Sequence, residues 1–463
     1  MIIFYLGANI HQEALDMIEQ DENAVIVYND ESEDISSFRS SINRLDAVGR
    51  SFCINRSKIK SSKQEFSIFN LDEQEQIVSH VLNDFTLFLM QTRENRFDFR
   101  GAFHNLCYFS DVIYYALKFI EKYKPQLVFC SYTPHELQSW IFFRTLEEAG
   151  IRIIRLISSP LPWILLPIVG LSNGHISKVT QNLRVDSSKK VSLYLSRLRG
   201  SYEHAIPYYE RVFSRLPSWR YLTIGMLSWP RHIMQYIEKL LVLYEYRSSI
   251  IPLADETPYA VYFLHYQPEM NTLPEAGLYC DQFQAIKKLA DAMPKGIKLL
   301  VKEHPSTFSK RCDRRWRPQG FYDRIANLPN TQICPPGLTS FQLIDKSIFV
   351  ASIAGVCLTE ALARGVPAVT FSSTRFSFFT GDLIIDASSL ILSDLKGALE
   401  RLITNGSKLS QENLTSCMNM VATLGYDGSD DEDFIPSSLE QAAGISRKAN
   451  RIAVYDIING NLS

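Results

Sequence analysis

The chain has 463 residues, 46% hydrophobic and 21% charged, which is the composition of a globular protein with room for large buried cores. Its formal net charge of −2 gives no overall field that would draw it to nucleic acid or anionic lipid. The eight cysteines include no C-x-x-C pair, so neither a zinc site nor a disulfide framework is expected.

Nothing in the chain reads as a targeting or membrane-spanning segment. The first residues, MIIFYLGANIHQEALD, lack the basic region and the cleavage site of a signal peptide. The longest apolar run, at 161–171, holds two prolines and is too short to span a bilayer. We therefore expect a cytoplasmic protein, with peripheral contact at the inner face of the cytoplasmic membrane as an extension of that expectation.

The first half of the chain alternates between segments typical of strands and of helices. Apolar runs predict strands at 2–6, 24–28, 126–130 and 151–157. Helical periodicity marks 111–123, and a second helix is expected from about 134 to 149. Short links between such elements indicate a parallel sheet, whereas the polar stretch from about 30 to 100 predicts no particular element.

A segment rich in aromatic residues and arginine, at 218–252, separates the two halves. One interpretation is a helix packed across a domain junction. The other is an aromatic and basic stripe that touches a membrane surface. The sequence leaves both open.

The alternation restarts in the second half, where strands are predicted at 260–264, 297–301, 331–334, 347–351, 367–371 and 383–385. Asp281 is a candidate N-cap for a helix with one apolar face, formed by Phe283, Ile286, Leu289 and Met293. The acidic run at 427–434 is expected to be a solvated loop.

The predicted fold class is α/β, with two Rossmann-like domains facing a cleft. The expected segments are an N-terminal domain, a helical linker, a C-terminal domain and a C-terminal segment that packs back on the first domain, at 1–235, 236–256, 257–440 and 441–463.

The predicted strand at 297–301 ends in Lys302, Glu303 and His304, and Pro305 follows. In open parallel sheets ligands bind outside the carboxyl ends of the strands, so these polar side chains lie where a ligand would meet them. Pro305 disfavours helix at His304 and limits where the imidazole points, and from there the ring can donate a hydrogen bond to a phosphate. The plainer alternative is a surface strand end with incidental charges.

The stretch FVASIAGVCLTEALARGVPAVTF, at 349–371, reads as strand, small-residue turn, helix and strand, with Gly365 as the helix C-cap. Small residues let a ligand approach the backbone, and the N–H groups at a helix start favour an anion. Ser352 adds a hydroxyl donor, and Glu360 is placed to accept hydrogen bonds from a ribose. Any tight strand-to-helix turn also needs small residues, and Glu360 is then an ordinary exposed helix residue.

Two further strand ends carry polar side chains. His265 and Glu269 follow the strand at 260–264 and enter a loop that is a candidate binding element, although Glu269 is equally explained as a cap or salt-bridge partner. His135 and Glu136 follow the strand at 126–130, and His135 is a candidate general base. Glu136 also has a structural explanation, because Thr133, Pro134 and Glu136 match a capping box.

The motifs YFLHYQPE, VKEHP, FYDRIANLPNTQICPP and ASIAGVCLTEALARGVPAVTF occur in this order and together resemble bacterial capsular and surface polysaccharide biosynthesis proteins. These are glycosyltransferase-like proteins with the two-domain GT-B fold, a group that includes transferases for 3-deoxy-manno-octulosonic acid (Kdo). The resemblance covers about 260–375 and is only architectural over the first half.

The resemblance implies a glycosyltransferase that takes a sugar from a nucleotide-sugar donor on the domain at 257–440 and passes it to an acceptor on the domain at 1–235. A CMP-sugar such as CMP-Kdo or a sialic-acid-like sugar is favoured, with a surface polysaccharide, lipopolysaccharide or lipid-linked glycan as acceptor. No metal or cofactor is implied beyond the nucleotide sugar, and other polysaccharide-assembly proteins are the expected protein partners.

In related CMP-sugar enzymes, the histidine of the His-Pro motif and a downstream serine bind the donor phosphate, and these roles fall here on His304 and Ser352. The expected donor-binding residues are His304, Ser352, Gly355, Glu360, Lys302 and His265, and the expected catalytic residues are His135, Glu136 and Glu269. Related proteins often carry Gly-Thr or Ser-Thr in the turn where this chain has Ala354, Gly355 and Val356. Two alternatives stay open: a nucleotide-sugar epimerase on the same fold, and a non-catalytic glycan-assembly subunit.

Overall fold

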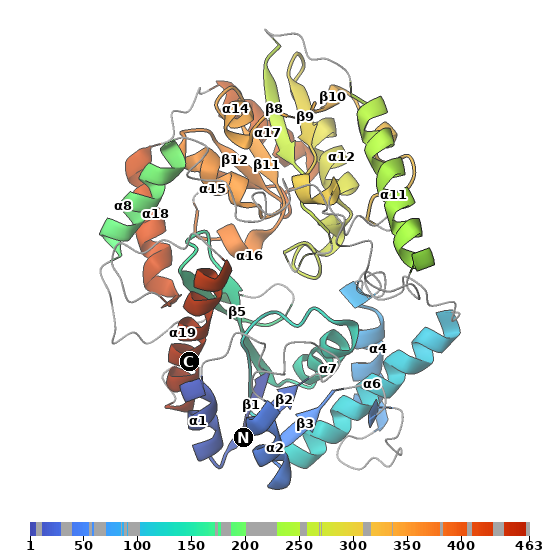
Figure 1. Ribbon diagram of the computed structural model, residues 1–463, viewed down its shortest axis with the longest axis vertical. Coiled ribbons are helices and arrows are strands. Elements are labelled where there is room, and N and C mark those ends of the chain that lie inside the picture. Colours follow the sequence, from blue (N-terminus) through green and yellow to red (C-terminus); the bar gives the residue numbers. More distant parts are fainter. Residues whose placement is uncertain are drawn as a thin grey trace. The chain divides into compact units, whose positions relative to one another are not determined.

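The computed structural model describes residues 1–5, 12–28, 39–54, 58–59, 71–84, 86–87, 90, 102–171, 175–176, 187–200, 229–250, 257–267, 269, 271–308, 316–335, 337–379, 383–404, 410–428 and 439–459. Their contacts divide the chain into two compact units (Figure 1). Unit 1 comprises Met1–Ser187 and Met420–Ser463, and unit 2 comprises Ser188–Asn419. None of the described helices is long and apolar enough to cross a membrane, and none of the described cysteines forms a disulfide.

Unit 1 is built on one sheet whose central strands are the predicted apolar runs. Within the described residues, parallel strands lie in the order β3-β2-β1-β4-β5, antiparallel β6 and β14 continue the sheet beyond β5, and β7 pairs with β6. The bounds are β1 Ile2–Tyr5, β2 Ala24–Tyr28, β3 Ser51–Cys53, β4 Leu127–Cys130, β5 Arg152–Ser158, β6 Ile164–Val169, β7 His175–Ile176 and β14 Tyr426–Asp427. Every residue of β2 is buried, as expected for a strand that is covered on both faces. The strand order reverses between β1 and β4, where such sheets bind ligands.

The helices of unit 1 come from both ends of the described chain. They include α1 Gln12–Gln20, α2 Arg39–Ala47, α4 Leu71–Leu82, α6 Ala102–Tyr123, α7 Leu137–Glu148 and α19 Leu439–Ile458. Although more than four hundred residues separate them, α19 lies beside α1 (Figure 1). Ala14, Leu15 and Ile18 of α1 belong to one buried cluster together with Ala449, Ala453, Val454 and Ile457 of α19. The last described helix therefore helps to close the core that the first strands begin.

Unit 2 contains a fully parallel sheet in the described residues, in the order β10-β9-β8-β11-β12-β13. The bounds are β8 Tyr259–Phe263, β9 Lys298–Lys302, β10 Thr331–Ile333, β11 Val350–Ser352, β12 Ala368–Thr370 and β13 Ile384–Asp386. This order is that of a dinucleotide-binding sheet, with the reversal between β8 and β11. The carboxyl ends of β8 and β11 are therefore the expected ligand position.

The elements around this sheet include α8 Ser188–Arg199, α11 Trp229–Ser248, η4 Gly277–Cys280, α12 Gln282–Ala292, η5 Pro305–Phe308, α13 Phe321–Ala326, α14 Ser340–Ile344, α15 Val356–Ala363, α16 Ser373–Phe376 and α17 Leu392–Thr404. The chain passes from unit 2 back to unit 1 within α18 Gln411–Leu424. Asp281 caps α12 as predicted, because its carboxylate accepts a hydrogen bond from the Phe283 amide. The end of α15 is also close to prediction: Arg364 is the C-cap, and Gly365 follows with a φ of +81° that favours glycine.

These sheets confirm the predicted fold class: the protein is an α/β protein with two Rossmann-like units. The expected cleft between the units, and the expected domain limits at 235, 257 and 440, stay predictions.

Three predicted elements have different bounds in the structure. The helix expected from about 134 begins at Leu137, and Glu136 is its N-cap residue without a side-chain capping bond. With the helix starting at Leu137, the predicted capping box does not form, and the Thr133 hydroxyl accepts a hydrogen bond from the buried Arg155 guanidinium at 2.6 Å. The helix expected at 111–123 already begins at Ala102. The strand expected at 347–351 occupies Val350–Ser352.

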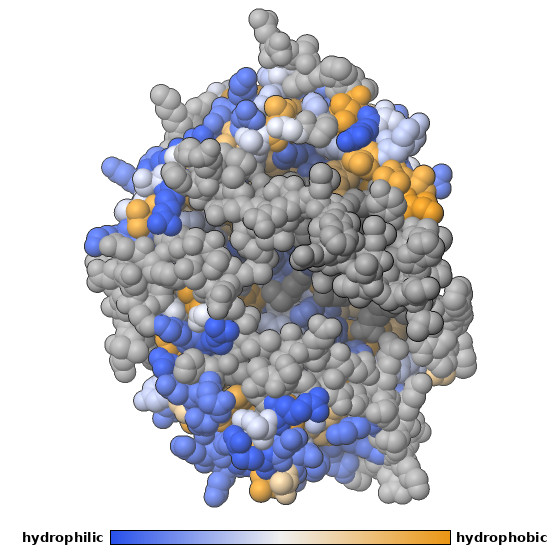
Figure 2. Space-filling view, in the orientation of Figure 1, coloured by the Kyte–Doolittle hydropathy of each residue, from blue (hydrophilic) through white to orange (hydrophobic). Residues whose placement is uncertain are grey.

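The connecting segment at 218–252 forms α11 over Trp229–Ser248, and residues 218–228 and 251–252 lie outside the described residues. Val242 and Tyr246 of α11 are buried, and the helix contacts α13 and η5 of its own unit. On another face α11 exposes the large apolar side chains of Ile237, Leu240, Leu241 and Tyr244, and Figure 2 shows hydrophobic surface over this helix. Of the acidic run at 427–434, only Asp427, in β14, and Gly428 are described.

Candidate functional site

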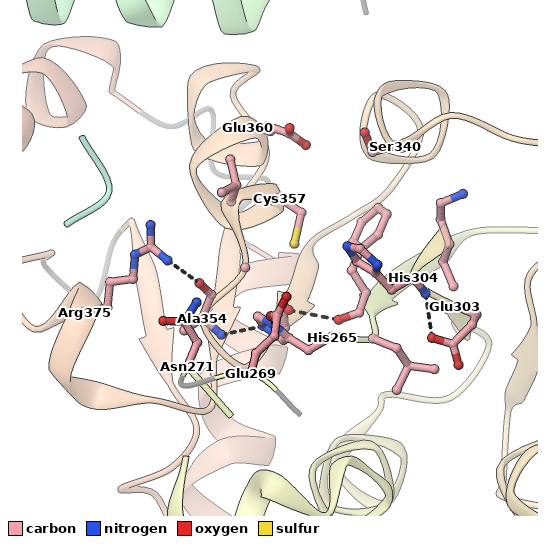
Figure 3. Close-up of a pocket in the computed structure, with 16 residues that line it drawn as sticks. His265, Glu269, Asn271, Glu303, His304, Ser340, Ala354, Cys357, Glu360 and Arg375 are labelled. Carbon is pink, nitrogen blue, oxygen red and sulfur yellow. Dashed lines mark hydrogen bonds and ion pairs between the residues drawn. The ribbon is translucent and has the colours of Figure 1, made fainter. Parts of the chain in front are cut away.

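A cavity of about 250 Å³ lies at the carboxyl ends of β8, β9 and β11, where the strand order of unit 2 reverses (Figure 3). It brings together the seven expected site residues of this unit, which are His265, Glu269, Lys302, His304, Ser352, Gly355 and Glu360. Asn271, Glu303, Ser340, Ala354, Cys357 and Arg375 also line it. His135 and Glu136 belong to unit 1 and do not line this cavity.

The turn between β11 and α15 forms one wall of the cavity. Gly355 is the N-cap of α15, and a Cβ atom at this position would lie 2.9 Å from Cys357 Sγ and 3.0 Å from Ser352 Oγ. A larger residue would therefore displace its neighbours. The Leu358 amide donates to the carbonyl of Gly355 at 3.1 Å. The amides that precede it at the helix start lie before the first regular helical hydrogen bond, and such a position favours an anion.

Ser352 does not present its hydroxyl proton to the cavity in this structure. The side chain is buried, and Oγ donates a hydrogen bond to the Phe263 carbonyl of β8 at 2.9 Å. The hydroxyl thus ties β11 to β8, and donation to a phosphate would require it to rotate away from Phe263. Its expected role as a phosphate donor stays a proposal.

His265 holds the same turn from the neighbouring strand end. Its Nε2 accepts a hydrogen bond from the Ala354 amide at 3.1 Å, and its Nδ1 lies 3.4 Å from a carboxylate oxygen of Glu269 (Figure 3). Because Nε2 accepts, the proton of the neutral ring belongs on Nδ1 and faces Glu269. In this arrangement the ring positions the turn, and a direct contact with donor phosphate stays a proposal.

Glu303 and His304 are adjacent in sequence but have different environments. The Glu303 carboxylate is fully buried against Arg317, with 2.6 Å between Arg317 Nε and Glu303 Oε2. Burial opposes ionisation of Glu303, but the Arg317 charge and hydrogen bonds from Arg317, Tyr322 and the His304 amide hold the pKa of this carboxyl below its ordinary value. Glu303 is therefore an ionised structural group.

His304 is a neutral imidazole in the cavity wall. Burial lowers its pKa to about 4, an effect that the charges of Glu269 and Glu303 only partly offset. The Tyr266 ring lies beside it, with 6.2 Å between the ring centroids. A neutral imidazole can donate one hydrogen bond to a phosphate oxygen and carries no charge of its own.

The ammonium of Lys302, which also lines the cavity, donates a hydrogen bond to the Leu338 carbonyl at 2.6 Å.

Arg375 is a site residue that our sequence analysis missed. It lies on α16, lines the cavity, and donates a hydrogen bond to the Ala354 carbonyl at 3.1 Å (Figure 3). Burial lowers its pKa below the ordinary value, yet arginine remains charged at neutral pH. A signal was present, because Arg375 follows the predicted strand at 367–371 and so belongs at the same carboxyl edge of the sheet.

In unit 1, His135 and Glu136 follow β4 at the reversal between β1 and β4. His135 Nδ1 lies 3.1 Å from the Thr133 carbonyl oxygen, which can only accept. Nδ1 therefore carries the proton of the neutral ring, and Nε2 is the basic nitrogen. The Tyr132 ring packs edge-on against the imidazole, with 5.4 Å between their centroids.

No group of three histidine, cysteine, aspartate or glutamate side chains that could hold a metal ion occurs among the residues that the structure describes.

No protein-family model matches the chain, and no curated protein matches it. Among solved structures, the chain is similar to a UDP-GlcNAc 2-epimerase from Methanocaldococcus jannaschii, with 11% identity, a TM-score of 0.27, and 98% of this chain and 99% of that chain covered. It is also similar to KpsC, a β-Kdo 2,7-transferase from Thermosulfurimonas dismutans, with 11% identity, a TM-score of 0.27 and coverage of 66% and 88%. A third is the lipopolysaccharide outer core galactosyltransferase WaaB, with 11% identity, a TM-score of 0.26 and coverage of 91% and 95%.

Proposed function

We propose that unit 2 binds the phosphate of a nucleotide sugar and that the protein is a GT-B-type glycosyltransferase. The observation that supports this most is the cavity at the β8–β11 reversal, where His304, Arg375 and the start of α15 line one space. An uncharged hydrogen-bond donor, a cation and a helix start thus surround the position where such sheets hold ligands.

These groups suit the charge changes of glycosyl transfer. When the bond between the anomeric carbon and the phosphate oxygen breaks, negative charge develops on the phosphate, and preorganised donors lower the barrier. In this proposal His304 donates a hydrogen bond to that phosphate, Arg375 supplies positive charge, and the first amides of α15 add to it. Glu360, which is largely buried on α15 and lines the same cavity, accepts hydrogen bonds from the ribose.

The proton of the acceptor hydroxyl needs a base, and His135 is our candidate. Its Nδ1 proton faces the Thr133 carbonyl, so Nε2 is the nitrogen that can accept a proton from the acceptor. Glu136 is the second candidate in unit 1, and Glu269 is the candidate carboxylate of the unit 2 cavity.

The motif resemblance supports the finer part of the proposal: a CMP-sugar donor, such as CMP-Kdo or a sialic-acid-like sugar, and a surface polysaccharide or lipid-linked glycan as acceptor. We also propose that the protein acts at the cytoplasmic side of the membrane, in peripheral contact with the membrane or with other polysaccharide-assembly proteins.

An epimerase that acts on a nucleotide sugar is the second candidate. The observation in its favour is that Glu269, His265 and Lys302, all able to exchange protons, line the same unit 2 cavity as the phosphate donors. A reaction on the donor alone would then need no group from unit 1.

Nucleotide binding and turnover test both candidates. We expect CMP, UDP, GDP or CDP to raise the melting temperature of the protein, since a ligand that binds only the native state stabilises it. Incubation of the matching nucleotide sugar without acceptor separates the reactions, because only an epimerase converts the sugar.

His304→Ala should lower turnover at least tenfold. Removal of one hydrogen-bond donor that stabilises developing charge raises the activation free energy by roughly 2–4 kcal/mol.

His80→Ala is the matched control, because His80 pairs with Glu148 in unit 1 and does not line the cavity. Normal turnover by a folded His304→Ala variant would rule out the proposed role of this imidazole.

A further inference from the structure

Arg317 is a buried arginine that does not line the cavity but binds two residues that do, Glu303 and His265. The side chain is 2% exposed, and all of its N–H donors can be assigned. Nε donates to Glu303 Oε2 at 2.6 Å, and Nη2 donates to Glu303 Oε1 and to the His265 carbonyl, both at 2.9 Å. Nη1 donates to Gln267 Oε1 at 3.1 Å and to the Trp316 carbonyl at 2.9 Å. Guanidinium has five N–H groups, so this side chain is fully committed.

On one side, Arg317 acts through Glu303 on the end of β9. While Arg317 holds this carboxylate, Oε1 also accepts the His304 amide at 2.7 Å and the Thr307 hydroxyl at 3.0 Å. The Tyr322 hydroxyl donates to Oε2 at 2.7 Å. The carboxylate thus fixes the backbone from which the His304 ring enters the cavity.

On the other side, Arg317 acts on the end of β8. It holds the backbone carbonyl of His265, whose ring in turn accepts the Ala354 amide from the β11–α15 turn. Arg375, beyond β12, holds the Ala354 carbonyl. A chain of hydrogen bonds therefore crosses the ends of β9, β8, β11 and β12, which are neighbours in the sheet. We call this chain the strand-end network.

We propose that Arg317 is the positioning residue of this site: it sets where His304 and the Ala354 turn stand relative to each other. Its effect on nucleotide binding rests on the proposed function, whereas its effect on the two imidazoles does not. Lysine cannot replace it, because one ammonium cannot reach Glu303, the His265 carbonyl and Gln267 together in the planar fork that guanidinium provides.

The test compares Arg317→Lys with Arg364→Lys in the full chain. Arg364 is a matched control, since it also pairs with a carboxylate through two nitrogens, to Asp345, but lines no part of this cavity. For each variant, NMR measures the imidazole resonances, calorimetry measures the affinity for the nucleotide that binds the parent protein, and a thermal melt measures folding.

We expect the His304 and His265 resonances to shift in Arg317→Lys and to stay in place in Arg364→Lys, with His135 unchanged in both. The nucleotide affinity should fall about tenfold in Arg317→Lys, because a displaced His304 ring loses its hydrogen bond to the charged phosphate. In the control the affinity should fall less than about twofold. Unmoved His304 and His265 resonances in a folded Arg317→Lys protein would overturn the proposal.

A milder variant covers the case in which Arg317→Lys does not fold. Tyr322→Phe removes one donor to Glu303 and leaves the ion pair intact. We expect a smaller shift of the His304 resonances in the same direction, and no shift would count against the network. If the parent protein binds no nucleotide, the proposed function fails, and the imidazole resonances still decide the role of Arg317.

Discussion

Lys302, Glu303 and His304 follow one another at the end of β9 and line the same cavity, but their side chains have different partners. The Lys302 ammonium donates to the Leu338 carbonyl, whereas the Glu303 carboxylate is bound by Arg317, fourteen positions further along. The Ser352 hydroxyl, on β11, donates to the Phe263 carbonyl of another strand. These partners depend on the tertiary fold, so the local sequence predicts where the residues lie but not the role of each.

The neutral His304 makes stability depend on pH. Its pKa is about 4 in the native protein and about 6.5 in an unfolded chain. Below about pH 6.5 the unfolded chain takes up a proton that the native ring does not, so the free energy of unfolding falls as the pH drops toward 4. The loss is roughly 3 kcal/mol at most. Glu269, Glu303, His265 and Arg317 are the charged or titratable groups that act on the ring.

Urea unfolding at pH 7 and pH 4.5 measures this loss, with His304→Gln as the comparison. The variant should lose less stability between the two pH values, because it lacks the titrating ring. An equal loss in both proteins would show that His304 does not carry the effect.

At the scale of elements, local signals predicted what depends on neighbours in sequence. The apolar runs became the central strands of both sheets, and Asp281 caps α12 because the acceptor and the amide it binds are only two positions apart. The capping box predicted before α7 does not form, since the helix begins at Leu137 and Thr133 is bonded to Arg155 on a different strand, a contact that the local pattern does not contain. The segment at 161–171 predicted no element, yet it contains β6, whose antiparallel partners β5 and β14 lie on either side of it.

Asp281→Ala should lower the free energy of unfolding by about 1 kcal/mol, because the Phe283 amide then loses its capping acceptor. Asp291→Ala, on the same helix, is the control. Asp291 is partly exposed and pairs with Lys287 one turn away, so its loss should cost less than about 0.5 kcal/mol. Chemical denaturation of both variants measures the difference, and equal costs would argue against the cap.

At the scale of the whole molecule, the two units are not consecutive in the chain. Unit 2 lies within the sequence of unit 1, which resumes at Met420. Helices α8 and α11 precede the first strand of the second sheet but contact other elements of unit 2. Arg199 of α8 donates to the Ala363 carbonyl of α15 at 3.0 Å, and the Tyr246 hydroxyl of α11 donates to the Cys334 carbonyl, just after β10, at 2.5 Å. Alternating strands and helices showed that there are two α/β units. The limits expected from sequence put α8 in the domain at 1–235 and most of α11 in the linker at 236–256, because the contacts that group these helices with unit 2 are distant in sequence.

A fragment of residues 188–424, which keeps α18 whole, should fold by itself and bind the nucleotide with the affinity of the full chain, because the sheet of unit 2, α8, α11 and the residues that line the cavity all lie within it. A fragment of residues 257–440, cut at the limits expected from sequence, lacks α8 and α11 and should melt at a lower temperature. Circular dichroism melts and calorimetry measure both. A better folded 257–440 fragment would contradict the division described above.

The packing of α19 on α1 also fixes an order of events during synthesis. Domains generally fold as units while the chain emerges from the ribosome, the N-terminal one first. Here the residues that complete the first sheet, β14 and α19, are translated after all of unit 2. The inserted unit can therefore reach its native state early, while Ala14, Leu15 and Ile18 meet their apolar partners only after α19 has been translated.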